Sequence, residues 1–289
     1  MKASIGDNVF RLFNYVFLAA AAATMLMPLV HLLAVSLSSP IAADSKIVFL
    51  LPVEFTTAAW VHVLQNKGLW TSFGVTVYIT IVGTALSLLF SVLTAYPLSR
   101  KEFLVRRPIM LGIIITMIFN APMIPFFLTV RELGLMNSLW ALILPGLIGT
   151  FDMIIIRTFF MGIPPELDDS ARIDGCSDAG IMFRIYLPLS KPVLATVSLF
   201  YAVGYWNTFN RAVLFIRNPD LWPLQMKLRA YLTSPEELAA VNLFMGDYDF
   251  NTTTLKAATI LFATVPILLV YPYLQKYFVK GSMLGSIKE

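Results

Sequence analysis

A charged island lies between two long apolar segments at Glu166 to Gly175, with the sequence Glu-Leu-Asp-Asp-Ser-Ala-Arg-Ile-Asp-Gly. Pro165 and the acids after it predict the first turn of a short helix, because proline is tolerated there and acids complement the positive end of the helix dipole. Gly175 can adopt the left-handed conformation that ends such a helix. Ser177 can then cap a second helical stretch that runs towards Pro188.

A short charged helix followed by a glycine corner suits binding rather than catalysis. Such a compact element at a membrane surface can fit a cleft on a soluble partner and carry rigid-body motion to the apolar segments beside it. The alternative is an ordinary polar loop with helix caps, and the loop chemistry alone does not exclude it.

The sequence has no other group of side chains with the spacing of a catalytic or metal site. Its two histidines, His31 and His62, and its one cysteine, Cys176, have no second ligand at metal-site spacing. Glycines and a lysine follow Gly281, but the pattern G-x-x-x-x-G-K-[ST] of a phosphate-binding loop is absent. We therefore predict that the chain itself has no catalytic residue, metal or bound cofactor.

Three polar or aromatic residues are candidates for a substrate path: Asp152, Trp206 and Asn207. An ionisable residue inside a membrane segment is a functional candidate, although Asp152 could instead pair with a neighbouring helix. Aromatic faces and amide groups suit sugar rings and hydroxyls, which favours Trp206 and Asn207. Trp206 could equally belong to the aromatic belt at a membrane interface.

The composition indicates a membrane protein. Of 289 residues, 58% are hydrophobic and 13% charged, with a mean hydropathy of +0.76, whereas soluble domains have about 25% charged residues. Six charge-free runs have at least 19 residues each, close to the roughly 20 that cross a membrane as a helix. We predict an all-α polytopic bundle. Its six transmembrane helices cover residues 14–38, 72–97, 108–130, 138–160, 190–210 and 257–277.

The domain prediction is one transmembrane domain over residues 1–289, with a cytoplasmic loop at 163–188 and a cytoplasmic tail at 278–289. Prolines in the third helix predict a kink. With both termini inside, we assign 12 lysines and arginines to the inner side and 7 to the outer loops, which follows the positive-inside rule. The net charge of +4 therefore orients the chain in a lipid bilayer and does not indicate nucleic acid.

The charged island resembles the coupling loop of permeases of ATP-binding-cassette importers, whose pattern is E-A-A, three residues, G, nine residues and I-x-L-P. Asp169, Ser170 and Ala171 stand at E-A-A, Gly175 at the glycine, and Ile185, Leu187 and Pro188 at the end, with both spacers intact. Asp169 and Ser170 depart from the pattern but keep an acid and a small residue. The resemblance implies an ABC importer type I permease fold and contact with an ATPase through these residues, together with Glu166 and Asp174.

Other segments are similar to MalG-like carbohydrate importers, among them Leu133 to Trp140, Gly204 to Asn207, and Gln275 to Gly281. In that family a second, homologous permease pairs with the chain, two copies of an ATPase bind beneath, and a solute-binding protein delivers the sugar. The resemblance implies that ATP and magnesium are bound by the ATPase, and that the chain lies in a bacterial inner membrane.

We therefore expect the membrane-spanning subunit of an ATP-driven carbohydrate importer, whose substrate could be an acidic oligosaccharide such as alginate. The alternatives are a stand-alone secondary transporter or channel, and a membrane enzyme. A secondary transporter is expected to have ionisable residues along its helices, for which only Asp152 is a candidate. An enzyme would need clustered catalytic side chains, and the sequence has none.

Overall fold

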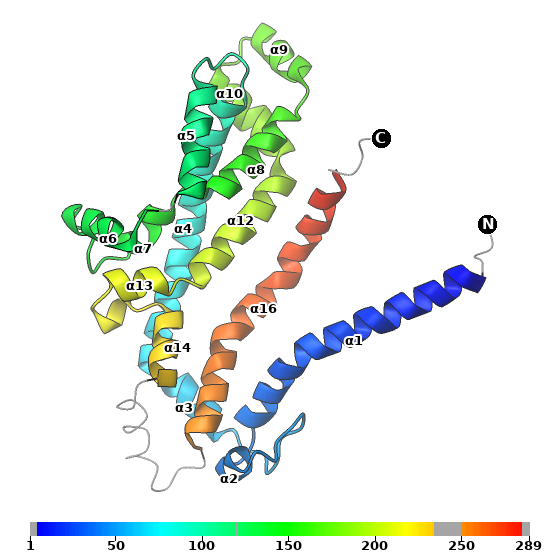
Figure 1. The fold of residues 1–289 in the computed structure, drawn as a ribbon, viewed down its shortest axis with the longest axis vertical. Helices are drawn as coiled ribbons and strands as arrows, with labels where there is room; N and C mark the ends of the chain where they lie inside the picture. Colours follow the sequence, from blue (N-terminus) through cyan, green and yellow to red (C-terminus); the bar gives the residue numbers. More distant parts are fainter. Residues whose placement is uncertain (1–4, 120, 234–249, 285–289) are drawn as a thin grey trace. The chain divides into compact units, whose positions relative to one another are not determined.

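The computed structural model describes the chain apart from residues 1–4, 120, 234–249 and 285–289, with side chains up to Val270 (Figure 1). Every regular element in the described part is helical. Contacts divide the chain into two compact units, one of Met1–Trp70 and Leu228–Pro266, the other of Thr71–Lys227 and Ile267–Glu289.

The first unit is built on one long helix and several short ones. It contains α1 (Ile5–Ser36), α2 (Pro40–Asp44), α3 (Ala58–Gln65) and the first part of α16 (Thr252–Leu284). Ala34 and Val35, near the end of α1, pack with Ala42 and Ala43 of α2 and with Ala257 of α16. Most other side chains of α1 are apolar and exposed, as expected for a helix whose surroundings are lipid or another membrane subunit.

The second unit contains the remaining helices. In chain order they are α4 (Lys67–Ser99), α5 (Arg106–Ile118), α6 (Met123–Glu132), α7 (Trp140–Ile143), the 3-10 turn η1 (Leu144–Gly146), α8 (Thr150–Met161), α9 (Pro165–Ile173), α10 (Asp178–Ile181), the π-helical turn η2 (Met182–Tyr186), α11 (Leu187–Leu189), α12 (Lys191–Trp206), α13 (Asn210–Phe215), the 3-10 turn η3 (Pro219–Leu221) and α14 (Leu224–Thr233), which continues into the first unit.

Hydroxyl groups and a glycine bring α4 and α12 together. Ser87 and Ser91 of α4 are four residues apart, as are Tyr205 and Tyr201 of α12, and the pairs form hydrogen bonds of 2.9 and 2.6 Å. Gly83 lies one turn before Ser87, and a Cβ there would be 2.7 Å from the Tyr205 ring. Small residues allow such close approach of membrane helices, and interhelical hydrogen bonds stabilise it.

The membrane helices are less continuous than the sequence predicts. Three helices, α1, α4 and α16, are each long and apolar enough to cross a membrane, and three bent pairs would raise the number to six if each pair is one span. The predicted kink in 108–130 is a full break between α5 and α6. Pro122 has no N–H to continue α5, while Pro125 falls in the first turn of α6, where proline is tolerated. The count of six spans stays a prediction.

The predicted helix at 138–160 is also divided. Pro145 and Gly146 lie in η1, Gly149 precedes α8, and the two parts meet at 47°. Proline and glycine are poor at continuing a helix, which accounts for the break. The predicted helix at 190–210 is α12, which begins with proline at its first turn and ends at Trp206.

Candidate coupling site

The candidate coupling loop connects α8 to α12 and is a helix, a corner and a second helix. Gly175 follows α9 with φ of +79°, which confirms the predicted left-handed corner. The Gly175 N–H donates to the Arg172 carbonyl at 3.0 Å and the Cys176 N–H to the Ala171 carbonyl at 2.9 Å. These two bonds form a Schellman motif, which satisfies carbonyls at the end of a helix.

The second helical stretch begins as predicted, since the Ser177 side chain accepts a hydrogen bond from the Gly180 N–H at 3.2 Å. It then widens into the π-helical turn, where the Leu187 N–H donates to the Met182 carbonyl. Pro188 explains the widening, because it has no N–H and its ring clashes with the carbonyl four residues earlier in an α-helix. π turns of this kind often mark functional sites.

An ion pair whose guanidinium lies over two tyrosine rings holds α9 against the end of α4. Arg100, directly after α4, pairs with Asp168 of α9, and their side chains are only 10% and 13% exposed. The Tyr186 hydroxyl donates to Asp168 at 2.9 Å and accepts from Arg100 at 2.9 Å. The Arg100 guanidinium lies over the Tyr96 and Tyr186 rings, 5.0 and 5.2 Å from their centroids. This cluster of Tyr96, Arg100, Asp168 and Tyr186 is called the anchor below.

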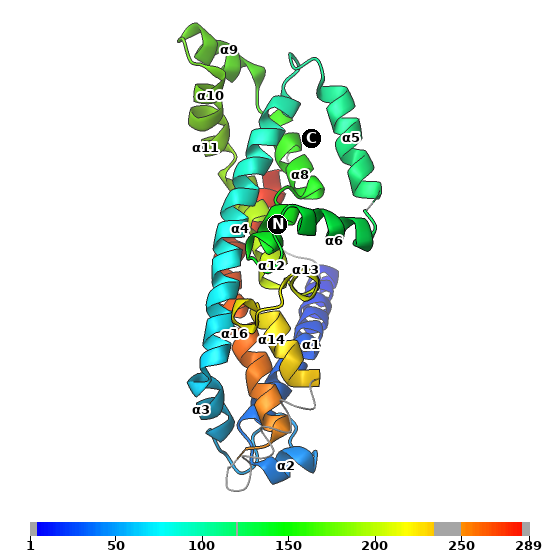
Figure 2. The same ribbon diagram turned by 90° about the vertical axis from the view of Figure 1, so that its left-hand side faces the viewer.

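Nothing local in the sequence predicts the anchor, because Asp168 is one of several acids in the charged island and Arg100 lies in another segment. The two residues are far apart in the chain, and only the packing of α9 beside α4 brings them together. Figures 1 and 2 show α9 and α10 at the end of the second unit where α4 ends and α5 begins.

The opposite face of α9 is exposed. Glu166, Asp169, Ser170 and Ile173 recur at helical spacing and are all exposed, Ile173 to 86%. Ala171 points the other way and is buried. The helix therefore presents two carboxylates and an apolar side chain together on its outer face.

The structure places the other predicted coupling residues around this helix. Asp174 and Gly175 are exposed at the corner, Ile185 and Leu187 are partly buried against the core of the second unit, and Pro188 is exposed. Arg172 forms an exposed ion pair of 2.6 Å with Asp178 across the corner. An exposed pair is worth little, so the Schellman motif and the anchor are the stronger constraints on the loop.

The predicted substrate-path residues do not form one group. Asp152 lines a cavity of about 210 Å³, together with Tyr201, Tyr205 and Arg211. Neither Trp206 nor Asn207 lines this cavity. Gly149 gives the Asp152 carboxylate its space, because a Cβ there would be 2.5 Å from Asp152 Oδ2.

Trp206 is 9% exposed and meets the Phe73 ring edge to face, with ring centroids 6.0 Å apart. Asn207 is exposed, and its amide donates to the Val203 carbonyl at 2.9 Å. Arg211 of α13 donates from its guanidinium to the Leu142 carbonyl at 3.0 Å and lines the cavity with Asp152.

Comparison with known proteins identifies the family. Residues 87–282 match the family described as binding-protein-dependent transport system inner membrane component. The chain is 42% identical over 283 residues to the polygalacturonan/rhamnogalacturonan transport system permease protein YtcP of Bacillus subtilis (strain 168), covering 98% of this chain and 99% of that protein. It is 43% identical over 285 residues to protein LplC of the same organism, with coverage of 97% and 95%.

A crystal structure of a bacterial ABC transporter involved in the import of the acidic polysaccharide alginate contains a similar chain. The TM-score is 0.88 at 35% sequence identity, over 96% of this chain and 99% of that one. The predicted all-α fold of an ABC importer permease is thereby confirmed. The chain belongs to the inner membrane components of binding-protein-dependent transport systems, as an ABC transporter permease of the sugar-importing kind.

Proposed function

We propose that this permease couples ATP hydrolysis on a partner ATPase to import of an acidic oligosaccharide. The observation that carries the proposal is the outer face of α9, with Glu166, Asp169 and Ile173 exposed on a helix fixed from behind by the anchor. A rigid helix with charged and apolar side chains on one face can bind a cleft with little loss of conformational entropy.

In this proposal the ATPase cleft receives α9 and moves it as a rigid body. The loop leads from α8 directly into α12, and the two helices pack against each other, so motion of α9 is transmitted to both. The anchor adds α4 to the elements that move. ATP and magnesium are bound by the ATPase, of which two copies serve this permease and a second, homologous one.

The proposed substrate class rests on the relatives and on one cavity. Polygalacturonan and alginate both carry carboxylates, and the names of one close relative and one structural neighbour include them. The cavity beside Asp152 offers the guanidinium of Arg211, which has five N–H donors and uses one of them for the Leu142 carbonyl. A guanidinium is a donor suited to carboxylates. A binding protein outside the membrane delivers the substrate.

Reconstitution in proteoliposomes tests the proposal. The chain is combined with its partner permease, the ATPase and the binding protein, and uptake of oligogalacturonate is measured with ATP, without ATP, and with a neutral oligosaccharide of equal length. ATP-dependent uptake that prefers the acidic sugar is expected. Equal uptake of the neutral sugar would contradict the substrate class, and uptake by the chain alone driven by an ion gradient would favour a stand-alone secondary transporter.

A further inference from the structure

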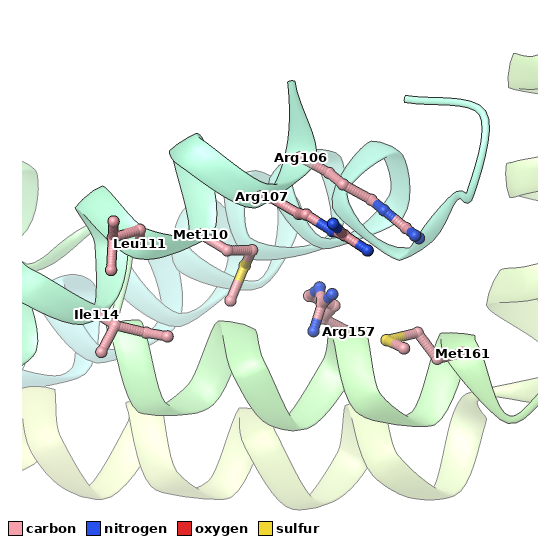
Figure 3. Close-up of a pocket in the computed structure, with 7 residues that line it drawn as sticks. All are labelled: Arg106, Arg107, Met110, Leu111, Ile114, Arg157 and Met161. Atoms are coloured by element: carbon pink, nitrogen blue, oxygen red, sulfur yellow. The ribbon is translucent and has the colours of Figure 1, made fainter. Parts of the chain in front are cut away.

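Three arginines converge on a cavity between α5 and α8. The cavity has a volume of about 360 Å³ and is lined by Arg106, Arg107 and Arg157 together with apolar side chains. Figure 3 shows Arg107 and Arg157 pointing towards each other from the two helices, with Arg106 beside them. Neither the coupling site nor the cavity at Asp152 includes any of these residues.

No described carboxylate forms an ion pair with the arginines of this cavity. The described ion pairs are Arg100–Asp168 and Arg172–Asp178, and neither involves the three arginines. Arg157 Nε donates to the Leu98 carbonyl at 2.8 Å and Arg106 Nη1 to the Arg100 carbonyl at 3.2 Å. Because a guanidinium has five N–H donors, most of the donors in the cluster are left for a ligand.

The start of α5 adds to this positive potential. Arg106 and Arg107 are the first two residues of the helix, its first turn contains no acid, and the Val105 cap makes no side-chain hydrogen bond. Cations at a helix N-terminus are unfavourable, and an anion there is stabilised by the helix dipole. The arrangement therefore favours an anionic group between the arginines.

The rest of the cavity is apolar. Met110 is buried behind the arginines, while Leu111 and Ile114 continue along α5 with 61% and 40% exposure. A soluble anion would leave this apolar surface uncovered, whereas a lipid would place its phosphate between the guanidiniums and an acyl chain along α5. Arginine recognises phosphate in a planar, bidentate geometry.

We propose that Arg106, Arg107 and Arg157 bind the phosphate head group of an anionic phospholipid in the inner leaflet. The inner position rests on the proposed function, because the ATPase binds α9 on the inner side and α9 is paired with Arg100, just before the start of α5 at Arg106. Basic pockets between membrane helices on the inner side can bind anionic head groups. The bound lipid would hold α5 against α8, the helix that leads into the coupling loop.

Native mass spectrometry of the purified full-length chain, with and without its partner subunits, tests this proposal without ATP or sugar. Retention of phosphatidylglycerol is compared with retention of phosphatidylcholine in the wild type, Arg107→Gln, Arg157→Gln and Arg157→Lys. Lys101→Gln removes one charge from the same basic loop outside the cavity and is the matched control. We expect the wild type and Lys101→Gln to prefer phosphatidylglycerol, and each glutamine variant to retain it roughly tenfold less.

Arg157→Lys keeps the charge but loses the bidentate geometry, so it should retain more phosphatidylglycerol than Arg157→Gln and less than the wild type. This order would exclude simple unfolding as the cause. Equal retention of the two lipids by the wild type would overturn the proposal, as would equal loss in Lys101→Gln and Arg107→Gln. Inorganic phosphate is the second probe, and displacement of the lipid by millimolar phosphate would show a soluble-anion site instead. Failure of sugar uptake in proteoliposomes would leave these results unaffected, so the two proposals fail separately.

Discussion

Asp168 and Asp169 are neighbours in the sequence but belong to opposite faces of α9. Asp168 is paired with Arg100 and bonded to the Tyr186 hydroxyl, whereas Asp169 is exposed. The resemblance marks Asp169 as the acid of the coupling pattern and leaves Asp168 without a role. In the structure Asp168 holds the helix in place, and Asp169 is available to a partner.

Charge changes at these two positions should therefore have different effects. Asp168→Asn leaves the Arg100 charge nearly buried without its partner, which costs about 3–5 kcal/mol when a buried pair is broken. We expect a lower melting temperature of the purified chain. Asp169→Lys should leave the melting temperature unchanged and lower retention of the ATPase in a pull-down roughly 10- to 100-fold, as for loss of a charge-assisted contact.

The matched comparison is Asp169→Asn, which removes the charge of Asp169 without reversing it. An acidic residue introduced into the ATPase cleft should partly restore binding of Asp169→Lys. If Asp168→Asn and Asp169→Lys lower the melting temperature equally, the anchor does not hold α9. If both bind the ATPase as the wild type does, α9 binds by shape and apolar contact alone.

Gly175 is the residue whose backbone makes the corner. A Cβ at Gly175 would meet nothing within 4 Å, so only its φ of +79° opposes substitution. Gly175→Val should be strained, because a β-branched residue is a genuine outlier at positive φ, whereas asparagine tolerates this conformation. We expect Gly175→Val to insert normally but to lose transport and substrate-stimulated ATPase activity, with Gly175→Asn close to wild type.

Gly180→Ala is the control in the same loop, since its Cβ would make an ordinary contact of 3.5 Å with Ser177 Oγ. It should keep both activities. Normal transport by Gly175→Val would mean that the corner is not needed for coupling.

At the scale of the elements, the close approach of α4 and α12 depends on Gly83. Gly83→Ala would place a methyl group 2.7 Å from the Tyr205 ring and disturb its hydrogen bond with Ser87. Overpacking of this kind costs about 1–3 kcal/mol. We expect a lower melting temperature in detergent. Gly74→Ala in the same helix, where a Cβ meets nothing within 4 Å, should not lower it, and an equal decrease in both variants would refute this account.

The sequence predicts local features of the elements better than their continuity. The helix start at Pro165, the corner at Gly175 and the cap at Ser177 depend on nearby residues, and the structure has all three. The break between α5 and α6 falls where the prolines predict a kink, but the division before α8 lies in an apolar run whose lack of charge predicts one continuous helix. The π-helical turn before Pro188 also follows from the proline, although the pattern I-x-L-P does not itself indicate it.

At the scale of the whole molecule, composition suffices for the fold class, because a long apolar run in lipid has few alternatives to a helix. The family is indicated by the resemblance of residues 166–188 to the coupling loop. The anchor and the arginine cavity could not be predicted in this way. Arg100 meets Asp168, and Arg107 meets Arg157, only after α4, α5, α8 and α9 have packed. Such contacts between distant residues carry no local signal in one sequence.

The orientation of the chain in the membrane is the last prediction. Twelve basic residues inside and seven outside predict that both termini, the turn at Lys101 and the coupling loop face the cytoplasm. Single-cysteine variants in a Cys176→Ser background test it with a membrane-impermeant maleimide. Ser45→Cys, exposed after α2, should be labelled in intact cells, and Lys101→Cys only after the membrane is opened. A reporter fused to the C-terminus should likewise be active on the cytoplasmic side. Labelling of Lys101→Cys in intact cells would reverse the orientation, and it would place α9 on the side of the membrane where no ATPase can bind it.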